Sequence, residues 1–318
     1  MVHVNDGAAS AARPATHPAT HDVFATIETG QLATTLVPSP VDYRVLVPDG
    51  PHAATQARPL MLCLHGGLGG HDLLEQVAPV FQDMWRSGAL PQMIVATPET
   101  GHSFYLDYRD GSQRWETFLL SELLPHLRER YPVSRQRDRT LVGGISMGGM
   151  GALRLGLKYP DIFGVIAAWE PAIEPALAWR DVRLEDRFWR SAELMEIRFG
   201  RPFDEAYWAA NNPATIAATR ARDLRAADLR IYLEVGSDDV YGLDRGTEFM
   251  HRTLFDHGIK HEFCTVYGAD HIGPTIAPRF RDGLAFIARI LKPQVPDWRV
   301  TRLRELVVVQ KRRAGIEV

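Results

Sequence analysis

Apolar runs alternate with helix-like stretches along most of the chain. Short, continuous apolar runs are typical of buried strands, and they occur at residues 60–64, 92–97, 139–143, 163–168, 229–235 and 261–267. An alternating run at 42–47 predicts one more strand. Apolar residues three and four positions apart predict helices at 72–85, 115–131, 147–159, 245–257 and 279–291. Strands that alternate with helices in this way indicate an α/β fold, with helices on both faces of a mostly parallel sheet.

Two features interrupt this regular pattern. Pro125 lies inside the 115–131 helix and is expected to kink it. The segment 170–227 has a helical composition without a regular period, and it is rich in aromatic residues. We predict that this segment is a helical lid or cap inserted over the strand ends. The alternative is a set of extra helices packed on the core.

The two ends of the chain differ in composition from the part between them. Residues 1–22 are rich in Ala, Pro, Thr and His and lack the apolar region of a secretory signal, which predicts a disordered leader. Residues 23–295 form the predicted α/β domain, which includes the 170–227 insertion. Residues 296–318 form a C-terminal extension, and its basic cluster at 311–313 is expected to be solvated.

The charge and cysteine content narrow the range of functions. A formal net charge of −3 over 318 residues gives no electrostatic reason to expect binding to nucleic acid or to an anionic membrane. No apolar run approaches the length of a membrane span. Cys63 and Cys264 both fall in strand-like runs and are expected to be buried thiols rather than a disulfide. We therefore expect a cytoplasmic protein; whether it forms a homo-oligomer stays open.

A glycine-rich turn stands between a predicted strand and a predicted helix, with the sequence Gly144-Ile145-Ser146-Met147-Gly148. Gly-x-Ser-x-Gly in this context predicts a nucleophile elbow, a sharp turn that exposes a serine hydroxyl. We expect Gly144 and Gly148 to lie where side chains would collide with the turn. The following helix begins with free N–H groups that can hold a developing anion.

A serine hydroxyl needs a base to act as a nucleophile at neutral pH, and the base needs an acid to orient it. Functional residues of parallel sheets gather after the carboxyl ends of the strands. His271 follows the last predicted strand and is the predicted base. Asp239 follows the strand before it and is the predicted acid, with Asp238 and then Glu170 as alternatives.

Two backbone N–H groups are expected to bind the oxyanion of an acyl-transfer reaction. One belongs to Met147; the other lies after the 60–64 strand, at Gly67 or, as the alternative, at Leu68. The residues predicted to line the substrate pocket are His65, Tyr105, Trp169, Glu170, Trp179 and Trp208. For His65 itself, ordering of its own loop is the favoured role. The sequence lacks metal-binding and P-loop motifs, so we predict neither a metal nor a cofactor.

Four motifs together resemble one branch of a known superfamily: Gly-Ile-Ser146-Met-Gly-Gly-Met-Gly-Ala-Leu, Leu-His65-Gly-Gly, Gly-Ser-Asp-Asp239 and Ala-Asp-His271. They are similar to the esterase D-like branch of the α/β-hydrolases, which includes S-formylglutathione hydrolases, feruloyl esterases and mycolyltransferases. The resemblance covers about residues 41–291. It implies a triad of Ser146, Asp239 and His271.

The residues and the resemblance lead to the same expected function. We expect a serine carboxylesterase that hydrolyses a small or medium ester through an acyl-enzyme, with a small-molecule ester as its partner. A thioesterase or an acyltransferase with the same triad is the first alternative. A binding protein that has the fold without the activity is the second.

Overall fold

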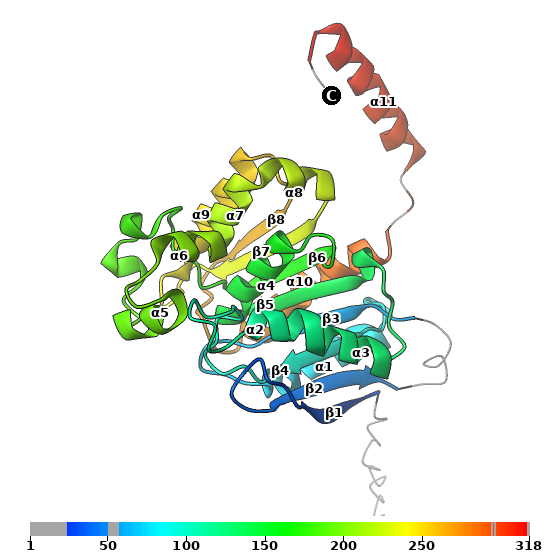
Figure 1. Ribbon diagram of the computed structural model, residues 1–318. Coiled ribbons are helices and arrows are strands. Elements are labelled where there is room, and N and C mark those ends of the chain that lie inside the picture. The colour runs from blue at the N-terminus through cyan, green and yellow to red at the C-terminus, as the bar shows by residue number, and fades with distance from the viewer. Residues whose placement is uncertain (1–23, 50–56, 294, 296, 317–318) are drawn as a thin grey trace, which may run out of the picture.

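The computed structural model describes residues 24–49, 57–293, 295 and 297–316. The leader predicted at 1–22 lies outside these residues. The strands build one eight-stranded sheet in the order β1-β2-β4-β3-β5-β6-β7-β8 (Figure 1). Their bounds are β1 Ala25–Leu32, β2 Val41–Pro48, β3 Leu60–Leu64, β4 Ile94–Pro98, β5 Thr140–Ile145, β6 Val165–Trp169, β7 Arg230–Gly236 and β8 Glu262–Val266.

The sheet is antiparallel only at one end. Strand β2 runs antiparallel to both β1 and β4, whereas the pairs from β4 through β3, β5, β6 and β7 to β8 are parallel. The six strands predicted from apolar runs and the one predicted from the alternating run are present within a few residues of the expected bounds. Strand β1 was not predicted, because this edge strand, Ala-Thr-Ile-Glu-Thr-Gly-Gln-Leu, is mostly half-buried or exposed and has no apolar run.

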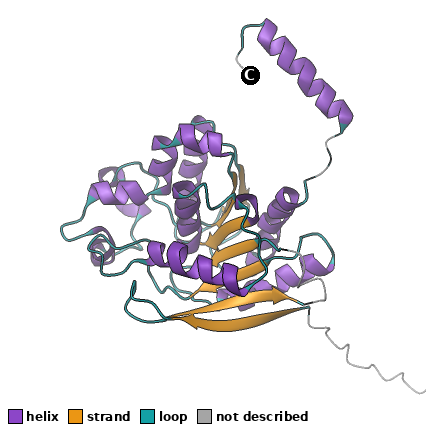
Figure 2. Ribbon diagram, turned by 45° about the vertical axis from the view of Figure 1, so that its right-hand side comes forward, coloured by secondary structure: helices purple, strands orange, loops and turns teal. Residues whose placement is uncertain are grey.

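Helices cover both faces of the sheet (Figure 2), which confirms the predicted fold class. Helices α1 and α10 share one face, while α2, α3, α4, α7 and α9 pack on the other. Their bounds are α1 Leu73–Arg86, α2 Trp115–Phe118, α3 Leu124–Arg130, α4 Met147–Lys158, α7 Pro213–Thr219, α9 Leu243–Asp256 and α10 Ile276–Leu291. The remaining helices are α5 Ala192–Phe199, α6 Glu205–Asn211, α8 Ala221–Ala227 and α11 Trp298–Arg313.

The helix predicted at 115–131 is interrupted just before Pro125, while the kink expected there stays a prediction. A π-helical turn, Leu119–Leu123, separates α2 from α3, and the Leu124 N–H bonds to the Leu119 carbonyl five residues back. Proline has no N–H group to continue the usual helical ladder, so the wider turn falls just before Pro125.

The segment 170–227 carries α5 to α8 and has two parts. Helix α7 packs on α4 and α9 and therefore belongs to the layer that covers the sheet, which is the alternative stated for this segment. Helices α5 and α6 lie farther out, toward the edge of the molecule (Figure 1). That the outer helices α5 and α6 form a lid stays a prediction.

The structure corrects the expected burial of Cys264 and agrees with the expected exposure of the basic C-terminal extension. Cys63 is buried, but Cys264 is exposed because it lies on the edge strand β8; both thiols are free. The C-terminal extension contains α11, which stands apart from the body in Figure 1 and has no buried residue. Within the described residues, none of the helices is both long and apolar enough to cross a bilayer.

Candidate active site

Ser146 links β5 to α4 in a strained backbone conformation. Its φ of 58° and ψ of −117° lie in a region that non-glycine residues rarely adopt. The Ser146 N–H donates to the Trp169 carbonyl over 2.9 Å. The Ser146 carbonyl accepts from Met150 N–H and from Ala172 N–H, both over 3.0 Å. The end of β6, the segment that follows it and the first turn of α4 therefore hold the turn.

The glycines of the motif are required by a close approach of the backbone. A Cβ atom on Gly144 would lie 2.5 Å from the Leu64 carbonyl oxygen, and one on Gly148 would lie 2.0 Å from the same oxygen. Real Cβ atoms do not come so close to a backbone oxygen, so the end of β3 leaves no room for a side chain at either position. The crowding predicted for these glycines is confirmed.

His271 and Asp239 form a buried pair after β8 and β7. The Nδ1 atom of His271 lies 2.8 Å from Asp239 Oδ2. Asp239 is held in turn, because its Oδ1 accepts from Tyr241 N–H over 2.8 Å and from Leu243 N–H over 3.3 Å. Asp238 is exposed and bonds to the Ser237 hydroxyl instead. Of the two adjacent aspartates, the geometry therefore brings only Asp239 to the histidine.

Glu170, which the sequence ranked only as the third choice of acid, approaches the same nitrogen of His271. Its Oε2 lies 2.9 Å from His271 Nδ1, and the side chain is fully buried. Arg279, which the sequence did not indicate at all, pairs with Glu170 Oε1 and with Glu234 Oε1. Burial disfavours the charged imidazolium, but the interactions of Nδ1–H with the accepting carboxylates of Asp239 and Glu170 outweigh it and raise the pKa of His271 to about 9.

Ser146 and His271 flank one short segment at the end of β6. Trp169 accepts the Ser146 N–H, and the next residue, Glu170, contacts His271. Because Nδ1 of His271 faces the two carboxylates, Nε2 is the ring nitrogen left for the serine. In the part of the chain that the structure describes, no hydrogen bond joins the Ser146 hydroxyl to this ring. In unliganded enzymes such contacts are often long and tighten when substrate binds.

The loop after β3 lies directly beside Ser146. A Cβ on Gly66 would be 3.5 Å from the Cβ of Ser146. His65 orders this loop, because its Nδ1–H donates to the Gly66 carbonyl over 2.8 Å and its Nε2 accepts from Thr100 N–H over 3.2 Å. Both ring nitrogens are thus engaged and the ring is fully buried. The loop-ordering role is the one its contacts support, and His65 has to be removed from the predicted pocket lining.

The predicted aromatic pocket residues also need correction. Trp169 is 1% exposed, donates its Nε1–H to the Arg279 carbonyl over 3.0 Å and stacks on Phe280. The Tyr105 ring is fully buried, with its hydroxyl on the His65 carbonyl over 2.8 Å. Trp208 is 2% exposed and packs edge-on against Trp179, which is itself only partly buried. The buried rings of Trp169, Tyr105 and Trp208 present little or no surface to a substrate, whereas the partly buried Trp179 stays a predicted pocket residue.

His102, an exposed histidine beside the loop after β3, was not singled out by sequence reasoning. A Cβ on Gly67 would lie 3.0 Å from His102 Nε2, so this imidazole lies against the loop. The Arg198 guanidinium donates from Nε to the His102 carbonyl over 2.9 Å. Desolvation by its surroundings, with the charges of Arg198 and Arg190, lowers the pKa of His102 to about 4. The His102 ring is therefore neutral at pH 7. Because His102 lies in a polar loop without a regular pattern, the sequence did not indicate its contact with the loop after β3.

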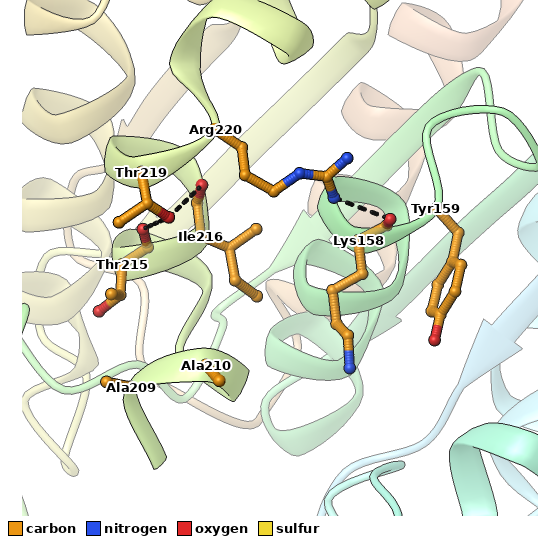
Figure 3. A pocket seen from close by; sticks show the side chains of 8 residues that line it. All are labelled: Lys158, Tyr159, Ala209, Ala210, Thr215, Ile216, Thr219 and Arg220. Atoms are coloured by element: carbon orange, nitrogen blue, oxygen red, sulfur yellow. Dashed lines mark hydrogen bonds between the residues drawn. The ribbon is translucent and has the colours of Figure 1, made fainter. Parts of the chain in front are cut away.

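A separate cavity of about 420 Å³ lies at the other end of α4. Its lining residues, shown in Figure 3, are Lys158, Tyr159, Ala209, Ala210, Thr215, Ile216, Thr219 and Arg220. Lys158 donates to Glu116, and Arg220 donates to the Leu157 and Lys158 carbonyls, so its cations are already engaged. The helix rise places this cavity about 16 Å from the serine end of α4. It is not part of the candidate active site.

A serine at a strained strand-to-helix turn, on a mostly parallel sheet whose last strands carry an acid and then a histidine, defines the class of α/β-hydrolases. The family model described as Putative esterase matches residues 35–272, and the chain belongs to this esterase family. The resemblance to esterase D-like proteins is thereby confirmed.

Individual relatives agree with this family. The chain is 30% identical over 148 residues to an acetyl esterase of Caldicellulosiruptor saccharolyticus, a match that covers 46% of this chain and 54% of the relative. It is 27% identical over 267 residues to Esterase Rv1288 of Mycobacterium tuberculosis, covering 77% of this chain and 55% of the relative. The chain thus spans about half the length of these curated relatives. The solved structure of a ferulic acid esterase matches with a TM-score of 0.69 at 23% identity, covering 84% of this chain and 98% of that chain, which shows the shared fold.

The close approach at the elbow generates a prediction. Gly148→Ala should lower the free energy of unfolding by about 2 kcal/mol or more, because the new methyl group would overlap the Leu64 carbonyl. Urea denaturation followed by tryptophan fluorescence measures this loss. Gly69→Ala is the matched control, since its nearest neighbour would be 3.8 Å away. Equal stability of the two variants would contradict the proposed crowding.

Proposed function

We propose that the protein is a serine carboxylesterase that hydrolyses a small or medium carboxylic ester. The observation that carries the proposal is the pairing of His271 with Asp239, next to the strained turn that presents Ser146, in a chain of an esterase family. A fixed histidine–carboxylate pair beside a serine is the arrangement that acyl transfer requires. We retain a cytoplasmic location as part of the proposal, in keeping with two free cysteines.

In the proposed mechanism Ser146 Oγ attacks the ester carbonyl carbon while His271 Nε2 takes the hydroxyl proton. The carbonyl oxygen becomes an oxyanion, which accepts hydrogen bonds from the N–H groups of Met147 and Gly67; removal of one such donor typically costs about 3 kcal/mol of barrier. Asp239 stabilises the imidazolium through Nδ1–H. The C–O bond of the ester then breaks, and the leaving alcohol takes the proton from Nε2.

The second half of the reaction repeats these steps with water. His271 Nε2 takes a proton from water, whose oxygen attacks the acyl carbon and forms a second oxyanion. When this intermediate collapses, the proton passes to Ser146 Oγ and the carboxylic acid is released. The neutral form of His271 is therefore needed to start both halves.

The nucleophile assignment is tested by removing the hydroxyl. Ser146→Ala should abolish hydrolysis of p-nitrophenyl acetate and labelling by a fluorophosphonate probe, because no other residue is assigned to attack. Ser121→Ala, which removes an exposed hydroxyl on the 119–123 turn, is the control and should keep both signals. If the wild-type protein takes no label, a binding protein with this fold is the better description.

The pH dependence follows from the environment of His271. Its pKa is raised to about 9 in the folded protein, so the base is mostly protonated at neutral pH. The rate constant kcat/KM should therefore rise with pH and level off only above about 9. Initial rates on p-nitrophenyl acetate, with the Ser146→Ala protein as the blank at each pH, measure the profile. A midpoint below pH 7 would show that the carboxylates do not act on His271 as described.

Hydrolysis and acyl transfer are separated by the products. With p-nitrophenyl butyrate and an added alcohol or sugar acceptor, we expect free butyric acid to be the main product, because water resolves the acyl-enzyme in the proposed mechanism. Chromatography of the products measures the ratio of acid to transferred ester. A dominant transfer product would replace the esterase by an acyltransferase with the same triad.

A further inference from the structure

We propose that Glu170 is a second carboxylate partner of His271, a positioning residue that holds the imidazole together with Asp239 and stabilises its charged form. The inference rests on the proposed esterase function for its catalytic meaning. The contact itself can be tested without turnover. Its physical basis lies in three observations: the backbone of Glu170, the pairing with Arg279 and the charges around the ring.

The backbone of Glu170 is held in a conformation that a glutamate does not favour. Its φ is 45°, in the left-handed region where glycine or asparagine would be expected. The Glu170 N–H donates to the Glu234 carbonyl over 2.8 Å. Strain of this kind persists where the surroundings impose it, and it gathers at functional sites. Here it places a fully buried carboxylate with Oε2 2.9 Å from His271 Nδ1.

Arg279 holds Glu170 and the loop of His271 at the same time. From the first turn of α10, its guanidinium pairs with Glu170 Oε1 and donates to Glu234 Oε1 over 2.6 Å. Its Nη1 donates to the carbonyl of Asp270, the residue before His271, over 2.8 Å. Gly236 N–H adds a hydrogen bond to Glu170 Oε1 over 3.3 Å. The second oxygen of Glu170 is then left for the histidine.

The charges around His271 explain why two carboxylates are tolerated. Asp239 and Glu170 face Nδ1, Asp270 Oδ1 accepts the His271 backbone N–H over 2.6 Å, and the Tyr241 ring lies edge-on at 4.9 Å. Behind Glu170, the positive charge of Arg279 offsets one carboxylate, as a buried charge requires.

Glu234, the other glutamate that pairs with Arg279, is the third acid in this balance of charge. Burial raises the pKa of Glu234 to about 7, against the lowering effect of Arg279, so part of the Glu234 population is neutral at pH 7. The remaining negative charge around Nδ1 favours the imidazolium that forms when His271 accepts the serine proton.

A second carboxylate beside one N–H group has a defined consequence for catalysis. The Nδ1 atom of His271 is hydrogen-bonded to Asp239 Oδ2 over 2.8 Å and lies 2.9 Å from Glu170 Oε2, which acts on the ring through its charge. Loss of the Glu170 charge should lower the pKa of His271 and destabilise the imidazolium of the transition state. The two effects act on the rate in opposite directions. The acid limb of the pH profile moves to lower pH, which raises the rate near neutral pH, whereas the plateau rate at high pH falls.

The test compares Glu170→Gln with the wild-type protein. We expect the acid limb of kcat/KM to move to lower pH by about one unit and the plateau of kcat to fall about tenfold, since one pKa unit is a tenfold change. Glu174→Gln is the matched control, because this buried glutamate of the same segment pairs with Arg190 and does not touch His271. An unshifted limb in Glu170→Gln, or an equal shift in Glu174→Gln, would overturn the proposal.

A second readout does not depend on activity. The low-field proton NMR signal of His271 Nδ1–H, followed against pH, gives the pKa of the ring directly, and Glu170→Gln should lower it by the same amount. If the wild-type protein shows no turnover, this titration still tests the contact while the esterase proposal fails. If Glu170→Gln does not fold, Glu170→Asp should give a shift in the same direction, because the shorter side chain withdraws the carboxylate; an unchanged pKa would overturn the proposal.

A double-substitution cycle separates partnership from packing. Asp239→Asn should keep more activity than Asp239→Asn with Glu170→Gln, because Glu170 still holds the ring in the single variant. The combined variant should fall to the level of His271→Ala. Equal rates for Asp239→Asn and the combined variant would mean that Glu170 does not support His271.

Discussion

The arrangement of the site depends on one close contact, the Leu64 carbonyl against the glycines on either side of Ser146. Because no side chain fits at Gly144 or Gly148, β3 and α4 approach each other closely at this point. That approach brings the loop after β3 against the serine, where its Gly66 lies beside the Ser146 Cβ. A wider separation would move the proposed N–H donors away from the place where an oxyanion would form.

A second set of contacts controls charge rather than distance. Arg279 lies between two buried glutamates and braces the loop that carries His271, so one guanidinium sets both the position and the electrostatic surroundings of the base. Its backbone carbonyl also receives the Trp169 indole N–H. The core packing of Trp169 on Phe280 and the alignment of the site are therefore coupled, which explains why this indole is buried and does not line a pocket.

Sequence was a good guide to the sheet and to the residues after its strands, and a poor guide to contacts between distant segments. Buried parallel strands require unbroken apolar runs, so the six parallel strands, with Asp239 and His271 behind two of them, could be predicted. The antiparallel strand β2 could be predicted from its alternating pattern. Edge strand β1 needs no such run. The contact of Glu170 with Arg279 joins residues 109 positions apart, and no local pattern encodes it. An aromatic ring in an irregular segment has the same sequence signature whether it packs in the core, as Trp208 does, or lines a pocket.

Helix α11 has a thermodynamic character different from that of the body. It spans Trp298–Arg313, and in the described residues it buries no side chain. Isolated helices of about this length are marginal in water, since nucleation is costly and few hydrogen bonds repay it. The helicity of α11 should therefore decline gradually on warming, as a helix–coil equilibrium, and not in the cooperative transition of the sheet. A circular dichroism melt of the intact chain would then show a sloping native baseline. This slope would report on α11 and not on the stability of the hydrolase fold.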